Sequence, residues 1–238
     1  MSDHPAPPLL ALHEAGACLW DCVALGEVML RFDPGPWRIR TARRFDVYEG
    51  GGEYNVARAL RKGFGQRAAI LTALPDNQLG RLGEELILQG GLDTSRMLWR
   101  DAHSSGNATR MGLNFVERGF GVRPALGCTD RIHSAASQIT AEDFDWEGIF
   151  GISKTRWFHT GGIFSALSSS TFAATRSAMT AARRHGAVVS YDLNFRPSLW
   201  ASRGGYEAAT DFNRQLLPLI DVLIGGVDDF SRVLAGKR

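Results

Sequence analysis

Short apolar runs alternate with longer amphipathic stretches along most of this 238-residue sequence, and this alternation limits the possible folds more than any other feature. The apolar runs have the length of buried strands, and the stretches between them have helical spacing. Such alternation is typical of a parallel sheet with helices on both faces. We therefore predict an α/β fold with strands at 22–26, 68–73, 157–160, 187–191 and 221–224, and helices at 171–185 and 206–217.

Three consecutive glycines, Gly50, Gly51 and Gly52, open one of the predicted helices. A loop without side chains lets a ligand approach the backbone, and the first turn of a helix offers free N–H groups to a polyol, carboxylate or phosphate. A tight turn without a ligand is the alternative. The polar residue Asn55 in the first turn favours a ligand. The apolar positions of this helix are expected to face the core: Val56, Ala59, Leu60 and Gly63.

Two segments, 31–49 and about 106–128, lose the helical period and show β-type alternation instead. We interpret them as β segments inserted into the α/β chain, which would cover a site as a lid. An edge extension or a dimer surface is the alternative. The expected organisation is an N-terminal tail over 1–20 and one α/β domain over 21–238 that includes both lid segments.

Polar residues follow two of the predicted strands at their carboxyl ends, where open α/β sheets bind ligands. Glu27 directly follows the first strand, and Asp192, Asn194 and Arg196 follow a later one at i, i+2 and i+4. An extended chain would point the last three to one side. The planar guanidinium of Arg196 fits a carboxylate. The alternatives are an ordinary loop carboxylate for Glu27 and a structural Asp192–Arg196 ion pair.

Charge and cysteine content exclude several classes of function. The 27 basic and 25 acidic residues give a net charge of +2, which argues against nucleic acid or an anionic membrane as partner. Three cysteines without a C-x-x-C motif predict reduced thiols in a cytoplasmic protein. No apolar run approaches the roughly 20 residues that span a bilayer, and the first residues make a poor signal peptide.

Four segments in this order resemble the ribokinase-like carbohydrate kinases: GEVMLRF, GGGEYNVARAL, DNQLGRLGEELILQGGLDTS and YDLNFRPSLW. The last segment is most similar to the branch of 2-keto-3-deoxygluconate kinases, and the resemblance extends from Val23 to about Gly236. It implies a ribokinase-like sheet with a small β lid that often mediates dimerisation. It also implies ATP-dependent transfer of a phosphoryl group to a sugar hydroxyl with Mg²⁺.

The resemblance also implies roles for individual residues. Gly50, Gly51 and Asn55 would hold sugar hydroxyls, and Glu27 lies near the position of a sugar contact. Arg131 and Arg196, with Asn194 beside them in the last motif, would face the acid end of a sugar acid. Two arginines at one substrate favour a sugar acid over a neutral sugar, because a carboxylate offsets their desolvation.

The sequence departs from the family in its catalytic part. The Gly-Ala-Gly-Asp motif, whose Asp takes the proton of the sugar hydroxyl, is absent, so no catalytic residue is assigned in this chain. Most of the ATP pocket would belong to the same absent portion. Asp229 stands where the family's metal-organising motif has Glu, which makes it the one candidate metal residue. We expect the N-terminal portion of a sugar-acid kinase, or a shortened member, without turnover on its own; the alternatives are a non-catalytic sugar-binding module and a nucleoside or neutral-sugar kinase relative.

Overall fold

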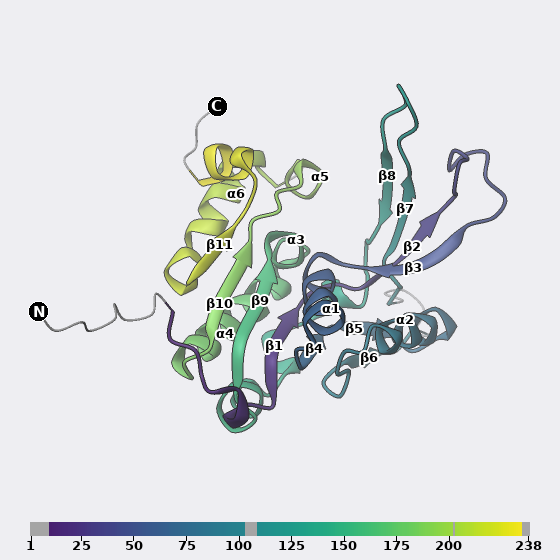
Figure 1. Cartoon of the computed structure of the whole chain (residues 1–238). Coiled ribbons are helices and arrows are strands. Elements are labelled where there is room, and N and C mark those ends of the chain that lie inside the picture. The colour runs from purple at the N-terminus through teal and green to yellow at the C-terminus, as the bar shows by residue number, and fades with distance from the viewer. Residues whose placement is uncertain (1–9, 103–108, 202, 235–238) are drawn as a thin grey trace, which may run out of the picture.

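The computed structural model describes residues 10–102, 109–201 and 203–234. Its centre is a sheet of five parallel strands in the order β11-β10-β9-β1-β4 (Figure 1). The predicted α/β fold is therefore confirmed. The strands of this sheet are β1 (Trp20–Leu25), β4 (Ala68–Leu71), β9 (Thr155–Gly161), β10 (Val188–Asp192) and β11 (Val222–Ile224).

Helices pack on both faces of the sheet because side chains alternate along each strand. Val23 and Leu25 of β1 join one apolar cluster, with α4 (Ser169–Arg184) and α6 (Gly205–Arg214). Ala24, between them, joins a second cluster with α1 (Gly52–Phe64). In Figure 1, α1 lies in front of the sheet and α4 behind it.

Shorter elements complete the α/β part. The predicted strand 68–73 is interrupted at Thr72. Its last residue, Ala73, begins a separate strand, β5 (Ala73–Pro75), which pairs in parallel with β6 (Leu98–Arg100). Three further helices are α2 (Gln78–Gln89), α3 (Gly162–Ser165) and α5 (Pro197–Trp200). No helix of the described segments is long and apolar enough to cross a membrane.

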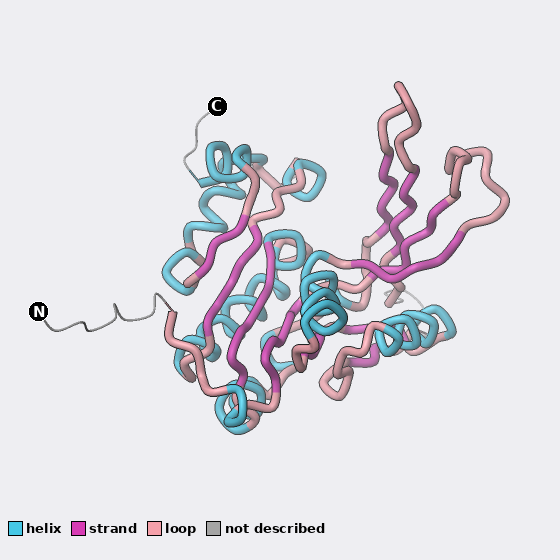
Figure 2. Tube along the Cα trace, in the orientation of Figure 1, coloured by secondary structure: helices cyan, strands magenta, loops and turns pink. Residues whose placement is uncertain are grey.

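A second sheet of four strands extends away from the first (Figure 2). Its order is β3-β2-β7-β8, and three half-buried rings, Phe32, Phe45 and Phe115, pack together on it. Both predicted β segments lie in this sheet, although β2 begins before residue 31 and β8 ends after 128; residues 106–108 lie outside the described part. The strands are β2 (Met29–Asp33), β3 (Asp46–Gly50), β7 (Leu113–Glu117) and β8 (Leu126–Asp130).

The buried face of α1 differs from the prediction. Its buried residues are Glu53, Tyr54 and Ala57, whereas Val56 is 37% exposed and Phe64 is 74% exposed. The helix is turned so that Tyr54 enters the core, where its hydroxyl donates a hydrogen bond to Glu49 Oε1 at 2.8 Å. The expected apolar stripe instead borders a hollow of about 440 Å³ on the sheet face, lined by Val56, Leu60, Phe64, Trp157 and Ile224 among others.

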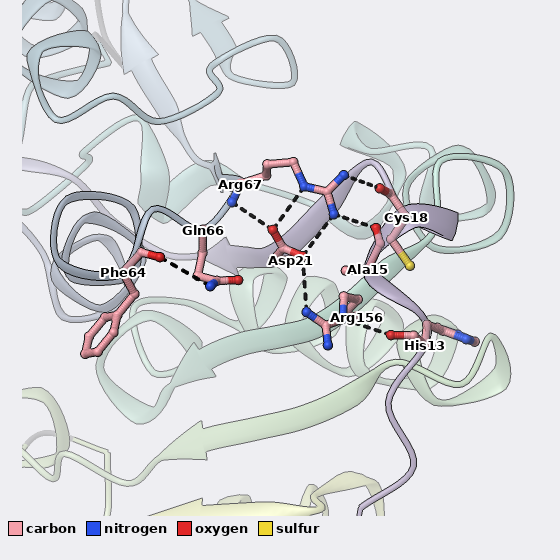
Figure 3. Close-up of polar contacts among 8 residues, drawn as sticks. All are labelled: His13, Ala15, Cys18, Asp21, Phe64, Gln66, Arg67 and Arg156. Atoms are coloured by element: carbon pink, nitrogen blue, oxygen red, sulfur yellow. Dashed lines mark hydrogen bonds and ion pairs between the residues drawn. The ribbon is translucent and has the colours of Figure 1, made fainter.

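The N-terminal segment is fastened to the sheet from residue 13 onward, so the predicted tail over 1–20 is too long. Arg67 donates hydrogen bonds to the carbonyl oxygens of Ala15 and Cys18, and Arg156 donates one to the carbonyl oxygen of His13 (Figure 3). Both guanidinium groups also pair with Asp21, whose pKa they hold well below its ordinary value. Trp20 already belongs to β1.

Candidate functional site

The glycine loop packs directly on the carboxyl end of the first strand. Gly51 is the N-cap of α1 in an extended conformation, and a Cβ added to it would collide with the carbonyl oxygen of Glu27. A residue with a side chain cannot occupy this place without moving the loop. Gly50 ends β3 opposite Met29, and a Cβ there would meet open space. Packing therefore requires a glycine at position 51 but not at position 50.

A second close approach brings the last motif of the sequence to the same loop. A Cβ added to Gly52 would lie 3.6 Å from Asn194 Nδ2. Residues far apart in the chain therefore meet at the carboxyl ends of β1 and β10, as open α/β sheets do at their ligand crevice. Asn55 lies on the exposed side of α1, and its backbone N–H donates to the carbonyl oxygen of Gly51.

The expectation that Asp192, Asn194 and Arg196 share one side of an extended chain is wrong. Strand β10 ends at Asp192, and Asn194 has a φ of +37°, in the left-handed region, which breaks the alternation of side chains. The backbone N–H of Asn194 donates a hydrogen bond to the Asp192 carboxylate. Burial nevertheless raises the pKa of Asp192, and repulsion from Asp229 adds to that effect, while the charge of Arg196 acts in the opposite direction.

Arg196 is exposed, and its Nη1 donates a hydrogen bond to the neighbouring carbonyl oxygen of Phe195, at 3.1 Å. Among the described residues no ion pair joins it to Asp192 or to another acid, so the alternative of a structural Asp192–Arg196 pair is not observed. Its guanidinium is therefore open to an anion from solution.

Glu27 and Arg131 form an ion pair inside the molecule. Glu27 is 3% exposed; its Oε2 lies 3.4 Å from Arg131 Nη1, and its Oε1 accepts a hydrogen bond from Ser134 Oγ at 2.6 Å. Burial raises the pKa of Glu27, while Arg131 and Ser134 act in the opposite direction. The structure brings Glu27, Gly51, Asn194 and Arg131 to one end of the sheet, and Arg196 lies two residues beyond Asn194.

Glu53 is an acidic residue of this site that sequence reasoning missed. It is 4% exposed, and its carboxylate lies in the space left by Gly26 and Gly161, where a Cβ on Gly161 would be 2.8 Å from Oε1. Burial raises its pKa to about 7, with smaller contributions from Glu27 and Asp192. An acid in the first turn of a helix usually faces solvent. No signal in the sequence pointed to Glu53, because the apolar spacing of the helix placed its core face elsewhere, whereas the structure buries Glu53 with Tyr54 and Ala57.

Asp229 does not make a metal site with the described residues. Its Oδ1 accepts a hydrogen bond from the backbone N–H of Phe195 and its Oδ2 accepts one from Gly226. Both oxygens thus hold the loops that follow β10 and β11. No group of three His, Cys, Asp or Glu side chains in the described ranges has the arrangement of a metal site. The residues described here do not fit a protein-built Mg²⁺ site, and we assign no step to a metal.

Known proteins resemble the chain over most of its length. The family model for pfkB family carbohydrate kinases matches residues 20–237. A 2-dehydro-3-deoxygalactonokinase from Haloferax volcanii is 30% identical over 90% of this chain and 63% of that protein. Fructokinase-1 from Zea mays is 30% identical over 76% of this chain and 53% of that protein.

A solved structure agrees with both sequence comparisons. The crystal structure of 2-dehydro-3-deoxygluconokinase from Thermotoga maritima superimposes with a TM-score of 0.81 at 35% identity. The match covers 90% of this chain and 62% of that one. The chain therefore spans less than two thirds of the length of each of these three relatives.

Proposed function

Because the chain belongs to the pfkB family of carbohydrate kinases, we propose that it binds the sugar in a phosphoryl transfer from ATP to a hydroxyl of a sugar acid such as 2-keto-3-deoxygluconate. The observation that carries this proposal is the approach of Gly52 to Asn194, which unites the glycine loop and the last motif at one end of the sheet. The names of the 2-dehydro-3-deoxy-sugar kinases among its relatives support the substrate class.

In this proposal the backbone of Gly50 and Gly51, with Asn55, holds sugar hydroxyls, because a loop without side chains admits a polyol close to its amides. Asn194 adds an amide at the same edge. Arg196 binds the carboxylate of the sugar acid from its exposed position, since Asp192 attracts it without forming an ion pair at contact distance among the described residues. ATP supplies the phosphoryl group, and Mg²⁺ accompanies its phosphates rather than a cage of the described residues.

The test is calorimetric titration of the 238-residue chain with 2-keto-3-deoxygluconate. We expect Arg196→Ala to weaken binding by roughly 2–5 kcal/mol, because a carboxylate would lose a charged, two-pronged partner. Arg176→Ala is the matched control: this arginine is also exposed, but it lies on α4. Unchanged affinity in Arg196→Ala would instead support a neutral-sugar or nucleoside kinase relative.

An ATP-coupled assay of the same chain addresses turnover. We expect none at ordinary kinase rates, because the Gly-Ala-Gly-Asp motif that supplies the base in the family is absent from the sequence. Sugar binding without turnover would agree with this proposal and with a non-catalytic sugar-binding module. Turnover at kinase rates would show that a base exists elsewhere in the chain.

We also propose that the second sheet serves as the lid and as the surface of a homodimer. A single layer of four strands has a hydrophobic face that needs a covering partner. Its three packed phenylalanines are half-buried, and Leu126 on β8 is 57% exposed. A second copy of the same sheet would cover such a face with matching residues.

A further inference from the structure

Backbone closes one side of the Glu27 carboxylate, because a Cβ added to Gly112 would lie 2.9 Å from its Oε1. Gly51 packs on the backbone carbonyl oxygen of the same residue. Ser134 occupies Oε1 with a hydrogen bond of 2.6 Å. This oxygen therefore has no room for a sugar hydroxyl.

The other oxygen of Glu27 faces Arg131. Oε2 is buried and has no hydrogen-bond partner among the described residues, and Arg131 Nη1 lies 3.4 Å away. Ionising a buried carboxyl group is costly without a counter-charge, so Arg131 stabilises the ionised form of Glu27. The same attraction restrains the guanidinium.

Arg131 keeps part of its surface open. Its side chain is 18% exposed, and Nη2 lies 3.5 Å from Met29 Sδ. A guanidinium carries five N–H donors in a fixed plane, and Glu27 faces one corner of it. The remaining donors are oriented in advance, which lowers the entropy cost of binding an anion.

We propose that Glu27 is a positioning residue: it holds the guanidinium of Arg131 in place for the carboxylate of the sugar acid and does not touch the sugar itself. This inference rests on the proposed function and refines it, because the family resemblance implied a place near a sugar contact for Glu27, whereas here Glu27 supports an arginine. The preference for a sugar acid over a neutral sugar would then depend on the pair of Glu27, which follows β1, and Arg131, which follows β8.

A double-mutant cycle tests the proposal on the 238-residue chain. Calorimetry with 2-keto-3-deoxygluconate is compared for wild type, Glu27→Gln, Arg131→Met and the double variant. We expect each single change to weaken binding about tenfold and the double variant to bind like Arg131→Met alone, because both changes remove one interaction. The methyl ester of the same sugar acid lacks the negative charge, so its binding affinity should change little in any variant.

Two outcomes would overturn the positioning role and return Glu27 to a direct sugar contact. One is that the losses of binding free energy in the two single variants add up in the double variant. The other is that the ester loses as much affinity as the sugar acid does. Thermal melting of every variant confirms folding. If Glu27→Gln does not fold, Ser134→Ala takes its place in the cycle. Ser134→Ala removes the hydrogen bond that orients Glu27 and leaves the charged groups of Glu27 and Arg131 in place. Absence of sugar-acid binding in the wild type would reject the proposed function, whereas additive losses reject only the role of Glu27.

Discussion

Glu53 has a strong effect on the pH dependence that we expect for this protein. Its pKa in the folded chain is raised from 4.5 to about 7, mainly by burial. The folded state therefore binds this proton more tightly than the unfolded state does, and stability falls as the pH rises from about 4.5 to about 7. Above that range the folded chain contains a charged carboxylate that would be better hydrated after unfolding.

We predict that Glu53→Gln removes most of this slope and raises the free energy of unfolding at pH 8 by about 2–3 kcal/mol. Urea unfolding at pH 5 and pH 8 measures it. Glu207→Gln is the matched control, because Glu207 also lies in the first turn of a helix, α6, but is exposed. An equal response of the two variants would contradict the role of burial.

The site residues show what sequence reasoning can reach. The sequence places Glu27, Gly51 and Asn194 at the candidate site because each follows a strand or lies in a glycine run, and the carboxyl ends of parallel strands meet. Glu53 and Ser134 were missed because their importance comes from burial and from partners that are distant in the chain. The conformation of Asn194 was also missed, because the sequence D-x-N-x-R fits an extended chain as well as a left-handed turn.

At the level of elements, the glycine loop and α1 act as one unit. The contact between Gly51 and the end of β1 fixes where the helix begins, so we predict that Gly51→Ala costs at least about 2 kcal/mol of stability through overpacking. It should also weaken sugar-acid binding, because the loop must move. Gly50→Ala provides the comparison: its Cβ would meet open space, and the expected change is within about 0.5 kcal/mol.

Thermal unfolding and calorimetry of the two alanine variants measure this difference. Similar melting temperatures for both would show that the loop tolerates a side chain at either position, and the close packing of Gly51 on Glu27 would then have no consequence for stability.

Elements with a strong local pattern were predicted well. Strands β9, β10 and β11 and helices α4 and α6 lie within a few residues of the expected ranges, since apolar runs and helical spacing specify them locally. The buried face of α1 was predicted wrongly, because the most apolar stripe of this helix borders a hollow and its core face contains Glu53 and Tyr54. Tertiary packing, rather than apolar spacing, decided the rotation of that helix.

For the whole molecule, two exposed apolar surfaces compete as sites of self-association: the second sheet, with Leu126, and the hollow, with Phe64. We predict a dimer through the sheet, so Leu126→Lys should give a monomer in sedimentation velocity, because a buried lysine in a symmetric interface is costly. Phe64→Lys is the control and should leave the dimer intact. Dissociation by Phe64→Lys alone would assign the contact to the hollow instead.

The pairing of β1 has a consequence for how the chain folds during synthesis. This inner strand pairs with β4 on one side, but its other neighbour is β9, in which Thr155 is opposite Trp20. Pairings between segments so far apart form slowly, because a long loop must close first. A ribosome must therefore release the residues as far as β9 before β1 gains its second neighbour. Until then, nascent chains expose an unpaired strand edge to chaperones and to one another.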